Sequence, residues 1–335
     1  MNKTILALAV SAATVTAGAS AADGQQAGSK EGTTVYSANG NSLQIGGRAE
    51  ARMSVREGEV RDVSRARIDL TGKVEINEGL YGIGFYELEF QSNHLDGDSE
   101  GGAGEFNGFE TEKVYAGIGG GFGEVTYGQV SGALGIITDF TDIMAYHGGA
   151  AAFKLYPGDT ADNMIAYNGQ FDNLELEASY RFADRVVTEE AEFSNNEIDG
   201  YSLSGTYAIT DTGLKLGLGL ADQGDNSQMM VGASYELNNL YFGALYGNAE
   251  VLNNDVTSIE LATGYKMDKT VVTATYGLRE IEDETSVEAL AVDVTYYFQP
   301  NFRSYMTYNF NMLDEDDFGK IASADEIALG LRYDF

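Results

Sequence analysis

The sequence contains no cysteine, no tryptophan and only two prolines among its 335 residues. Without cysteine, the fold depends on no disulfide bond even in an oxidising compartment. Basic residues are scarce as well: 20 Lys and Arg face 52 Asp and Glu, which gives a formal net charge of −32 at pH 7. Because proteins bind nucleic acid through Lys and Arg that neutralise phosphates, this composition excludes nucleic acid as a partner.

Long apolar runs are also missing, except at the N-terminus. Residues 1–21 predict a secretory signal, with Lys3, an apolar stretch over Thr4–Val15 and a small-residue cleavage motif at Ala19-Ser20-Ala21. The apolar stretch is shorter than the roughly 20 residues that a membrane-spanning helix needs. Loss of this signal removes Lys3 and makes the mature chain more negative still. We therefore expect either a soluble exported protein or a membrane barrel.

Glycine, tyrosine and phenylalanine are abundant, at 42, 21 and 16 residues, which favours strands and turns over helices. From Ser42 onward apolar and polar residues alternate with period two. In Ser42–Ser54, for example, Leu43, Ile45 and Met53 share one face while Arg48 and Arg52 share the other. The segment exceeds the usual length of about five or six residues in a globular sheet. Alternating segments of about ten residues, divided by turns, are typical of an outer-membrane barrel.

Residues 42–335 contain sixteen such segments, two of which are expected to start at Thr257 and Ser286. Together they are expected to form a single all-β domain, an antiparallel transmembrane β-barrel. Short turns such as Asn238-Asn239 and Asp268-Lys269 alternate with longer, mostly acidic connections such as Ser92–Glu110. An even number of strands places both termini on the side of the short turns. Residues 22–41 are polar and rich in glycine, and they predict either a tail or a plug of the lumen.

Residues 130–160 break the alternation over a length that is uncommon for a loop without function. The segment is too apolar for a solvated tail, because Leu134, Ile137 and Phe140 need a surface to pack on. The charged residues in its first half are Asp139 and Asp142, both acidic. We expect this segment to fold into the barrel and to leave a narrow gap beside these two carboxylates.

Several segments together resemble one known family, the Gram-negative general diffusion porins, and most closely its OmpU-type members. They are TVYSANGNSLQIGGRAEAR, LYGIGFYELEF, YAGIGGGFGEVTYGQ, GALGIITDFTDIMAYHGG, ASYRFADR, PNFRSYMTYNF and the terminal ALGLRYDF. The resemblance covers essentially the whole chain. It implies a 16-stranded barrel in the bacterial outer membrane, assembly into a homotrimer, and a third extracellular loop that folds into the lumen as a constriction.

The resemblance also implies the residues of the constriction. Arg48 and Arg67 match basic positions of the family on the barrel wall, and Arg65 and Arg52 lie nearby on the same predicted face. Asp142 matches an acidic position on the loop, and Asp139 precedes it by three residues. The chain departs from the family pattern at three positions. Tyr146 stands where the family often has an acid, and Glu112 and Thr160 stand where it often has basic residues. The weakened basic wall and the net charge predict a preference for cations.

Two of these interpretations have a simpler alternative. The arginines can merely balance nearby acids on the wall, namely Glu50, Asp69 and Glu75. Small residues on the predicted outer face suit a contact between protomers, but glycine can equally relieve curvature in the sheet. These small residues are Gly47, Ala49, Ala51, Gly82 and Gly84.

The function that we expect is passive diffusion of small hydrophilic solutes and cations, without catalysis. A surface-binding protein, such as an adhesin or receptor acting through acidic loops, is the alternative from another class, and a substrate-specific channel is a further one. Outer-membrane lipid and lipopolysaccharide are the expected surroundings. We predict no cofactor and no metal site, because His94 and His147 are isolated and the acidic run Asp314–Asp317 is typical of a solvated loop.

Overall fold

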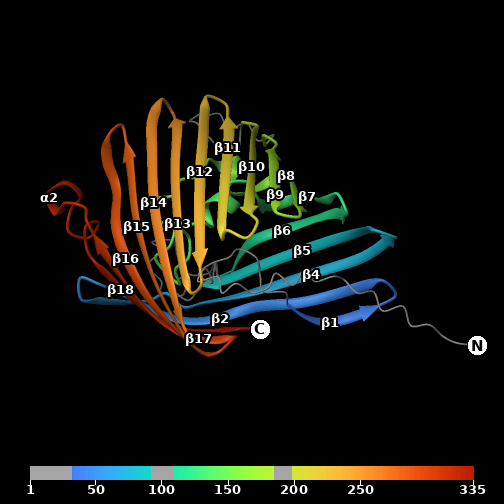
Figure 1. Ribbon diagram of the computed structural model, residues 1–335, viewed down its shortest axis with the longest axis horizontal. Coiled ribbons are helices and arrows are strands. Elements are labelled where there is room, and N and C mark those ends of the chain that lie inside the picture. The colour runs from blue at the N-terminus through green and yellow to red at the C-terminus, as the bar shows by residue number, and fades with distance from the viewer. Residues whose placement is uncertain (1–31, 92–108, 185–197) are drawn as a thin grey trace, which may run out of the picture.

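A computed structural model describes residues 32–91, 109–184 and 198–335 (Figure 1). The predicted signal and most of the predicted tail, residues 1–31, lie outside the described residues. Sixteen antiparallel strands form a closed ring in which each strand pairs with its neighbours in the sequence, and the last strand, β18, pairs with the first, β2. The predicted 16-stranded barrel is therefore confirmed. The ring closes at the pairs Asp334↔Arg48 and Glu326↔Arg56.

The strands of the ring keep the order of the sequence. They are β2 (Asn41–Arg56), β4 (Arg65–Asn77), β5 (Leu80–Gln91), β6 (Phe109–Gly120), β7 (Gly123–Ser131), β8 (Thr160–Phe171), β9 (Leu174–Arg181), β10 (Gly200–Ile209), β11 (Leu214–Gln223), β12 (Asn226–Leu237), β13 (Leu240–Val251), β14 (Asn254–Met267), β15 (Thr270–Ile281), β16 (Glu284–Gln299), β17 (Phe302–Asn311) and β18 (Glu326–Asp334). Closure leaves the sheet without an edge, so every strand has hydrogen-bond partners on both sides, as a lipid environment requires.

Two short strands extend this ring. Strand β1 (Thr33–Ala38) pairs with Asn41–Ile45 of β2, just beyond the point where the C-terminal residue Phe335 pairs with Gly47. Strand β3 (Glu59–Asp62) pairs with the other end of β2. The sequence-based division placed residues 33–38 in a tail or plug, whereas the structure places them in a strand that prolongs the barrel seam.

Side chains alternate between an exposed and a buried face of the wall. On β13, Phe242, Ala244 and Tyr246 are exposed, while Tyr241 and Leu245 are buried. The exposed face carries large apolar side chains on most strands, whereas the buried face carries many polar ones, such as the serines and threonines of β10. This distribution is the reverse of a soluble protein and fits a barrel whose outer surface contacts lipid.

The connections differ between the two ends of the barrel and around its circumference (Figure 1). Strands β12 to β16 are joined by two-residue turns at both ends of the barrel. At one of these ends the turns are Leu252–Asn253 and Glu282–Asp283, and all four residues have positive φ values of 52° to 65°. Such turns extend the pairing, so β14 and β16 begin at Asn254 and Glu284, a few residues before the expected starts at Thr257 and Ser286.

Helical structure in the described residues is limited to single turns. These are α1 (Gly135–Thr138), η2 (Tyr156–Gly158) and α2 (Glu315–Phe318). In that part of the chain no helix is long and apolar enough to cross a membrane. Both α1 and η2 belong to the segment between β7 and β8, residues 132–159, which corresponds closely to the interruption predicted at 130–160.

Candidate pore-lining site

The charged side chains of β2, β4 and β5 form one cluster on the buried face of the wall. Arg48 and Arg67 lie opposite each other in the register of β2 and β4, and Arg67 lies opposite Glu89 of β5. The Arg67 guanidinium is 3.0 Å from a carboxylate oxygen of Glu87 and 2.7 Å from one of Glu89. Arg48 reaches the same Glu89 oxygen at 3.2 Å. These two arginines are thus held by acids of β5.

The other two predicted arginines join the same network through a second acid. The Nε atom of Arg65 donates to Glu50 at 2.6 Å, and Arg52 lies 3.7 Å from the same carboxylate. Arg65 also lies 3.6 Å from Glu89, which links the two groups of ion pairs. Since Glu50, Glu87 and Glu89 are at most 3 % exposed, the acids are fixed parts of the wall.

The structure therefore brings all four predicted arginines together, but it also surrounds them with acids. Glu50 was considered as a partner from the sequence, whereas Glu87 and Glu89 were missed. The signal was present in LYGIGFYELEF, where these glutamates alternate with Leu88 and Phe90 and so share one face of the strand. Within this cluster the positive charge is largely compensated, and buried pairs of this kind resist separation because either partner alone would be left unpaired.

Residues 132–159 pack against the buried face of the opposite strands. Leu134, Ile137 and Phe140 are 0 to 3 % exposed, and they occupy space that glycines leave open on β11 to β13. A Cβ atom on Gly217 would lie 2.6 Å from the Phe140 ring, and one on Gly219 would lie 2.7 Å from Leu134. The glycines are Gly217, Gly219, Gly232 and Gly243. Because these glycines have no side chains, the strands leave a flat bed of backbone on which the segment packs.

A single buried acid, Glu260 of β14, holds both arms of this segment. One carboxylate oxygen accepts a 2.6 Å hydrogen bond from the Thr141 hydroxyl, and the other accepts bonds of 2.8 and 2.9 Å from the backbone N–H groups of Ala151 and Ala152. Glu260 is 3 % exposed. Because three hydrogen bonds from the segment converge on one buried carboxyl group, this acid fixes the path of the chain on either side of its turn.

The turn of the segment reaches the seam of the barrel. The Tyr146 hydroxyl donates to Glu326 of β18 at 3.3 Å, and the His147 ring lies 3.0 Å from the Thr307 hydroxyl and 3.3 Å from Glu326. Arg52 lies 5.2 Å above the Tyr146 ring. Tyr146, which replaces an acid of the family pattern, thus contacts the basic cluster through its ring instead of through a charge.

The two predicted carboxylates of the segment are not paired with the arginines. Among the ion pairs of the described residues, none joins Asp139 or Asp142 to another side chain. Burial raises the pKa of Asp139 to about 6, an effect that Lys154 and Lys215 oppose. Burial also raises the pKa of Asp142 to about 7, assisted by the nearby charges of Asp139 and Glu260. One oxygen of Asp142 is buried without a hydrogen-bond partner.

Lysines near Asp139 were not predicted from the sequence. Lys154 of the segment pairs with Asp159 at 2.7 Å, and Lys215 of β11 pairs with Glu175 at 3.3 Å. Each lysine is therefore engaged by another acid. In the part of the chain that the structure describes, no group of three or more His, Asp or Glu side chains could hold a metal ion.

Comparison with known proteins places the chain in a family. A family described as Gram-negative porin matches residues 7–316. The chain belongs to this family of porins. Relatives named outer membrane protein U, from Vibrio cholerae and Vibrio parahaemolyticus, are 54 % and 47 % identical over the full length of both chains. The porin-like protein L of Photobacterium profundum is 37 % identical, again over both full lengths.

Solved porin structures share the fold of this porin. A Salmonella typhi OmpF structure in complex with daunomycin superposes with a TM-score of 0.76 at 20 % identity, over 90 % of this chain and all of the other. The OmpT structure of Vibrio cholerae in its trimer form gives a TM-score of 0.67 at 18 % identity, over 89 % of this chain and all of the other. The resemblance to OmpU-type porins is thus confirmed. The chain is an outer-membrane porin channel that spans the membrane many times, and its relatives are channels instead of enzymes.

Proposed function

We propose that this porin conducts small hydrophilic solutes and ions by passive diffusion through a lumen that residues 132–159 narrow. The observation that carries this proposal is the pair of Glu260 contacts with Thr141 and with Ala151–Ala152, since they hold the segment on the buried face of the wall. A segment held on that face occupies part of the cross-section of the barrel. The gap that remains would lie between this segment and the charged cluster of β2, β4 and β5.

We further propose that Asp139 and Asp142 give the channel its preference for cations. Arg48, Arg52, Arg65 and Arg67 line the gap, but Glu50, Glu87 and Glu89 compensate much of their charge. The loop carboxylates have no ion-pair partner in the described residues and add negative charge at the narrowest part. Charged side chains at close quarters set the sign of ion selectivity.

Planar-bilayer recording in a KCl gradient tests both statements. The wild-type protein should conduct with a reversal potential on the cation-selective side, and an Asp139→Asn/Asp142→Asn variant should move that potential towards zero. A matched Glu250→Gln variant removes an exposed acid at a strand end and should leave it unchanged. A silent wild-type protein would contradict the channel, whereas an unaltered potential in the double variant would contradict the role of the carboxylates alone.

Assembly as a homotrimer is also proposed, on the basis of the small residues of β2 and β5. Ala49 and Ala51 are exposed, and a Cβ atom on Gly84 would meet nothing within 4 Å, so this face is flat and open. Gly47 has another role, because its φ of 152° and the nearby Phe335 ring belong to the barrel seam. The relative OmpT is described in a trimer form. Gly84→Trp should convert trimers into monomers in light scattering of the detergent-solubilised protein, and an unchanged mass would contradict this contact.

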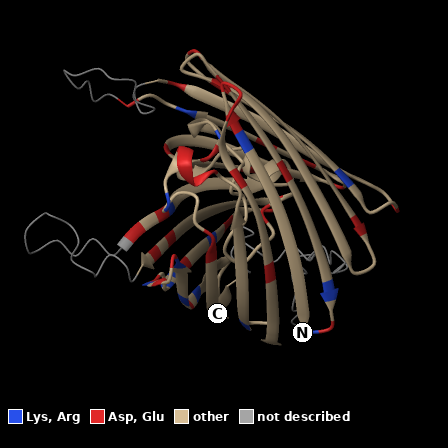
Figure 2. Cartoon of the chain, turned by 90° about the vertical axis from the view of Figure 1, so that its left-hand side faces the viewer, with Lys and Arg blue, Asp and Glu red and all other residues tan. Residues whose placement is uncertain are grey.

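The remaining apolar belt would face lipid, and the loop end would meet lipopolysaccharide. Figure 2 shows long parts of the strands without charged residues, with acidic residues at the ends of the strands, in the connections and at isolated positions within the strands. Exposed Leu218, Leu261 and Met306, each more than 50 % exposed, require a hydrocarbon environment.

A further inference from the structure

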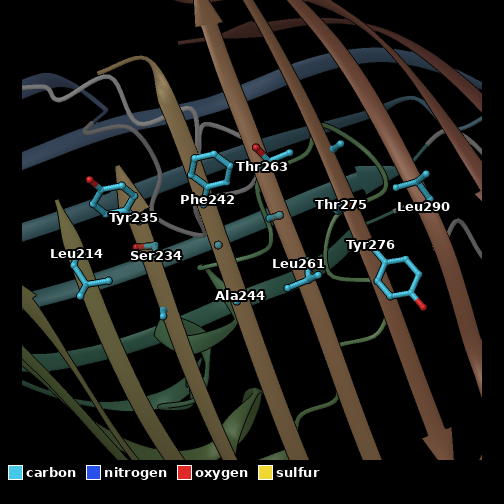
Figure 3. A pocket seen from close by; sticks show the side chains of 14 residues that line it. Leu214, Ser234, Tyr235, Phe242, Ala244, Leu261, Thr263, Thr275, Tyr276 and Leu290 are labelled. Carbon is cyan, nitrogen blue, oxygen red and sulfur yellow. The ribbon is translucent and has the colours of Figure 1, made fainter. Parts of the chain in front are cut away.

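The exposed face of β11 to β16 is not flat but hollowed. A shallow groove of about 580 Å³ crosses these strands, and its accessible lining is almost wholly apolar (Figure 3). Its floor consists of small residues at two adjoining levels: Ala233 and Ala244 on β12 and β13, and Thr263 and Ala274 on β14 and β15. Register pairs Ala233 with Ala244 and Thr263 with Ala274. Ala244 and Thr263 lie diagonally to each other, because Ala244 pairs with Leu261, so the two pairs form a depression that steps by one level across four strands.

Large side chains border the depression on both sides. Tyr235 and Phe242, a register pair, stand beside Thr263 on the level nearer the chain termini. Leu261 and Tyr276 stand beside Ala244 on the next level, with Leu290 continuing the row. Phe242 and Leu261 are 45 % and 51 % exposed. Across four strands, at a spacing of about 5 Å, the depression has room for a long stretch of a hydrocarbon chain.

The occupant follows from the environment and from charge. Because the barrel spans the outer membrane, this face lies in hydrocarbon, and the small residues of β2 and β5 that suit a protomer contact are on other strands. Between Asn248 and Glu288 the sequence has three basic residues. Lys266 and Lys269 lie at the end of the strands nearer the termini, where Asp268 is the acid of the turn, and Arg279 lies near the far end.

The far end of the same strands is strongly acidic, with Glu250, Asp255, Glu282 and Asp283. An anionic headgroup is therefore disfavoured there and favoured at Lys269, since Lys266 alternates with exposed Tyr265 and Met267 and so lies on the other face of the wall. Lys269 is exposed, and its Nζ makes one long hydrogen bond of 3.5 Å, to the Phe298 carbonyl. Its ammonium group therefore remains accessible to a phosphate. Ala274 follows Lys269 by five residues, which corresponds to about 17 Å of strand.

We propose that this groove, named here the β11–β16 groove, binds one acyl chain of a phospholipid from the leaflet on the side of the chain termini. The phosphate of that lipid lies at Lys269, and the chain runs past Tyr265 to the floor at Thr263 and Ala274. Large side chains on either side keep the chain in the depression, where it contacts more protein surface than a lipid on a smooth wall would.

Native mass spectrometry of the detergent-purified protein, titrated with phosphatidylethanolamine or phosphatidylglycerol, tests the proposal. An Ala244→Phe/Ala274→Phe variant fills the groove, and the expected result is about a tenfold loss of bound phospholipid, equivalent to about 1.4 kcal/mol. The control is Ala178→Phe, which adds the same ring at an alanine of β9 outside the groove and should bind as the wild type does. Retarded migration of unboiled protein on gels verifies that each variant is folded.

A second variant, Lys269→Gln, leaves every residue that lines the groove unchanged and should weaken phospholipid binding several-fold. Equal binding by the filled variant and the wild type would overturn the proposal, as would an equal loss in the Ala178→Phe control. Retention of added lipopolysaccharide in place of phospholipid, with the same dependence on Ala244 and Ala274, would assign the groove to the wrong leaflet and would also overturn it. None of these outcomes depends on whether the channel is cation-selective.

Discussion

On strands β2, β4 and β5 the buried face of the barrel carries ion pairs, whereas on β11 to β13 the same face carries glycines. In the first region charged side chains extend from the wall, and neighbouring side chains of opposite charge neutralise them, as in the contacts of Arg67 with Glu87 and Glu89. In the second region glycines have no side chains, so Leu134, Ile137 and Phe140 can lie against the backbone of the strands. One region supplies a fixed polar surface, and the other supplies a bed for a separate segment.

This difference separates two tasks within one wall. The ion-paired region is rigid but close to neutral in net charge, so it cannot by itself make the channel strongly selective for cations or for anions. The glycine region positions the segment that holds the uncompensated carboxylates, Asp139 and Asp142. Selectivity in the proposed mechanism therefore depends on packing at the glycines as much as on the charges themselves. Changes to the two regions should have different effects.

The largest effect is expected from Gly243, where a Cβ atom would overlap the carbonyl oxygen of Phe140. Gly243→Ala should displace residues 132–159 and lower the free energy of unfolding by about 1–3 kcal/mol, as overpacking usually does. Urea titration of tyrosine fluorescence measures the loss, and bilayer recording should show altered conductance.

Gly247→Ala is the matched control, on the same strand and the same face. A Cβ atom there would meet nothing closer than 3.6 Å, so stability and conductance should stay near those of the wild type. If both alanine variants behave alike, the glycines do not act as a bed for the segment.

The next effect concerns Glu260, which accepts three hydrogen bonds from the segment. Glu260→Leu leaves the N–H groups of Ala151 and Ala152 buried without acceptors, at a cost of about 1–3 kcal/mol. We expect frequent brief closures in single-channel records. Glu260→Gln keeps one acceptor oxygen and should show fewer closures; steady currents in the Leu variant would show that the segment does not need this anchor.

A smaller effect is expected when the ion-paired region loses one arginine. Arg67→Gln leaves Glu87 and Glu89 without their closest partner and adds net negative charge to the wall. The ratio of K⁺ to Cl⁻ permeability should rise by up to about fivefold, since one unit charge about 4 Å from an ion is worth about 1 kcal/mol in water. Reversal potentials in a KCl gradient measure the ratio, and a fall would mean that the arginine does not face the ion path.

The smallest effect is a pH dependence between pH 5 and pH 8. The pKa values of Asp139 and Asp142 are raised to about 6 and about 7, so the neutral forms gain population as the pH falls through this range. Cation preference should therefore rise from pH 5 to pH 8 in the wild type and stay flat in the Asp139→Asn/Asp142→Asn variant. Equal slopes in both proteins would place the titrating groups elsewhere.

The sequence predicted much of the fold because its signal is local. Alternation with period two reports directly which side chains share a face, so the sixteen strands and the arginines of β2 and β4 could be identified from neighbouring residues. The boundaries of β14 and β16 were less exact, because residues such as Asn253 and Asp283 adopt positive φ in turns tighter than expected.

The contacts of residues 132–159 could not be predicted in the same way. Gly217, Gly232 and Gly243 serve a partner that is far away in the sequence, and a glycine on a strand gives no indication of what approaches it. Glu260 likewise resembles any other inward acid until Ala151 is placed beside it. Asp139 and Asp142 were predicted to border the gap, and their place in it remains a proposal.

The most direct test uses the absence of cysteine in the chain. A Cβ atom on Gly277 of β15 would lie 3.0 Å from the Cβ of Ala151. This is shorter than the roughly 3.5–4.5 Å between the Cβ atoms of a disulfide bond, so a small outward shift of Ala151 allows the bond to form. The Ala151→Cys/Gly277→Cys protein should form this bond on mild oxidation, seen as a mobility shift on a non-reducing gel, while conductance and reversal potential stay unchanged. Absence of the bond, or a channel that changes its conductance when the bond forms, would contradict the position of residues 132–159 on the buried wall.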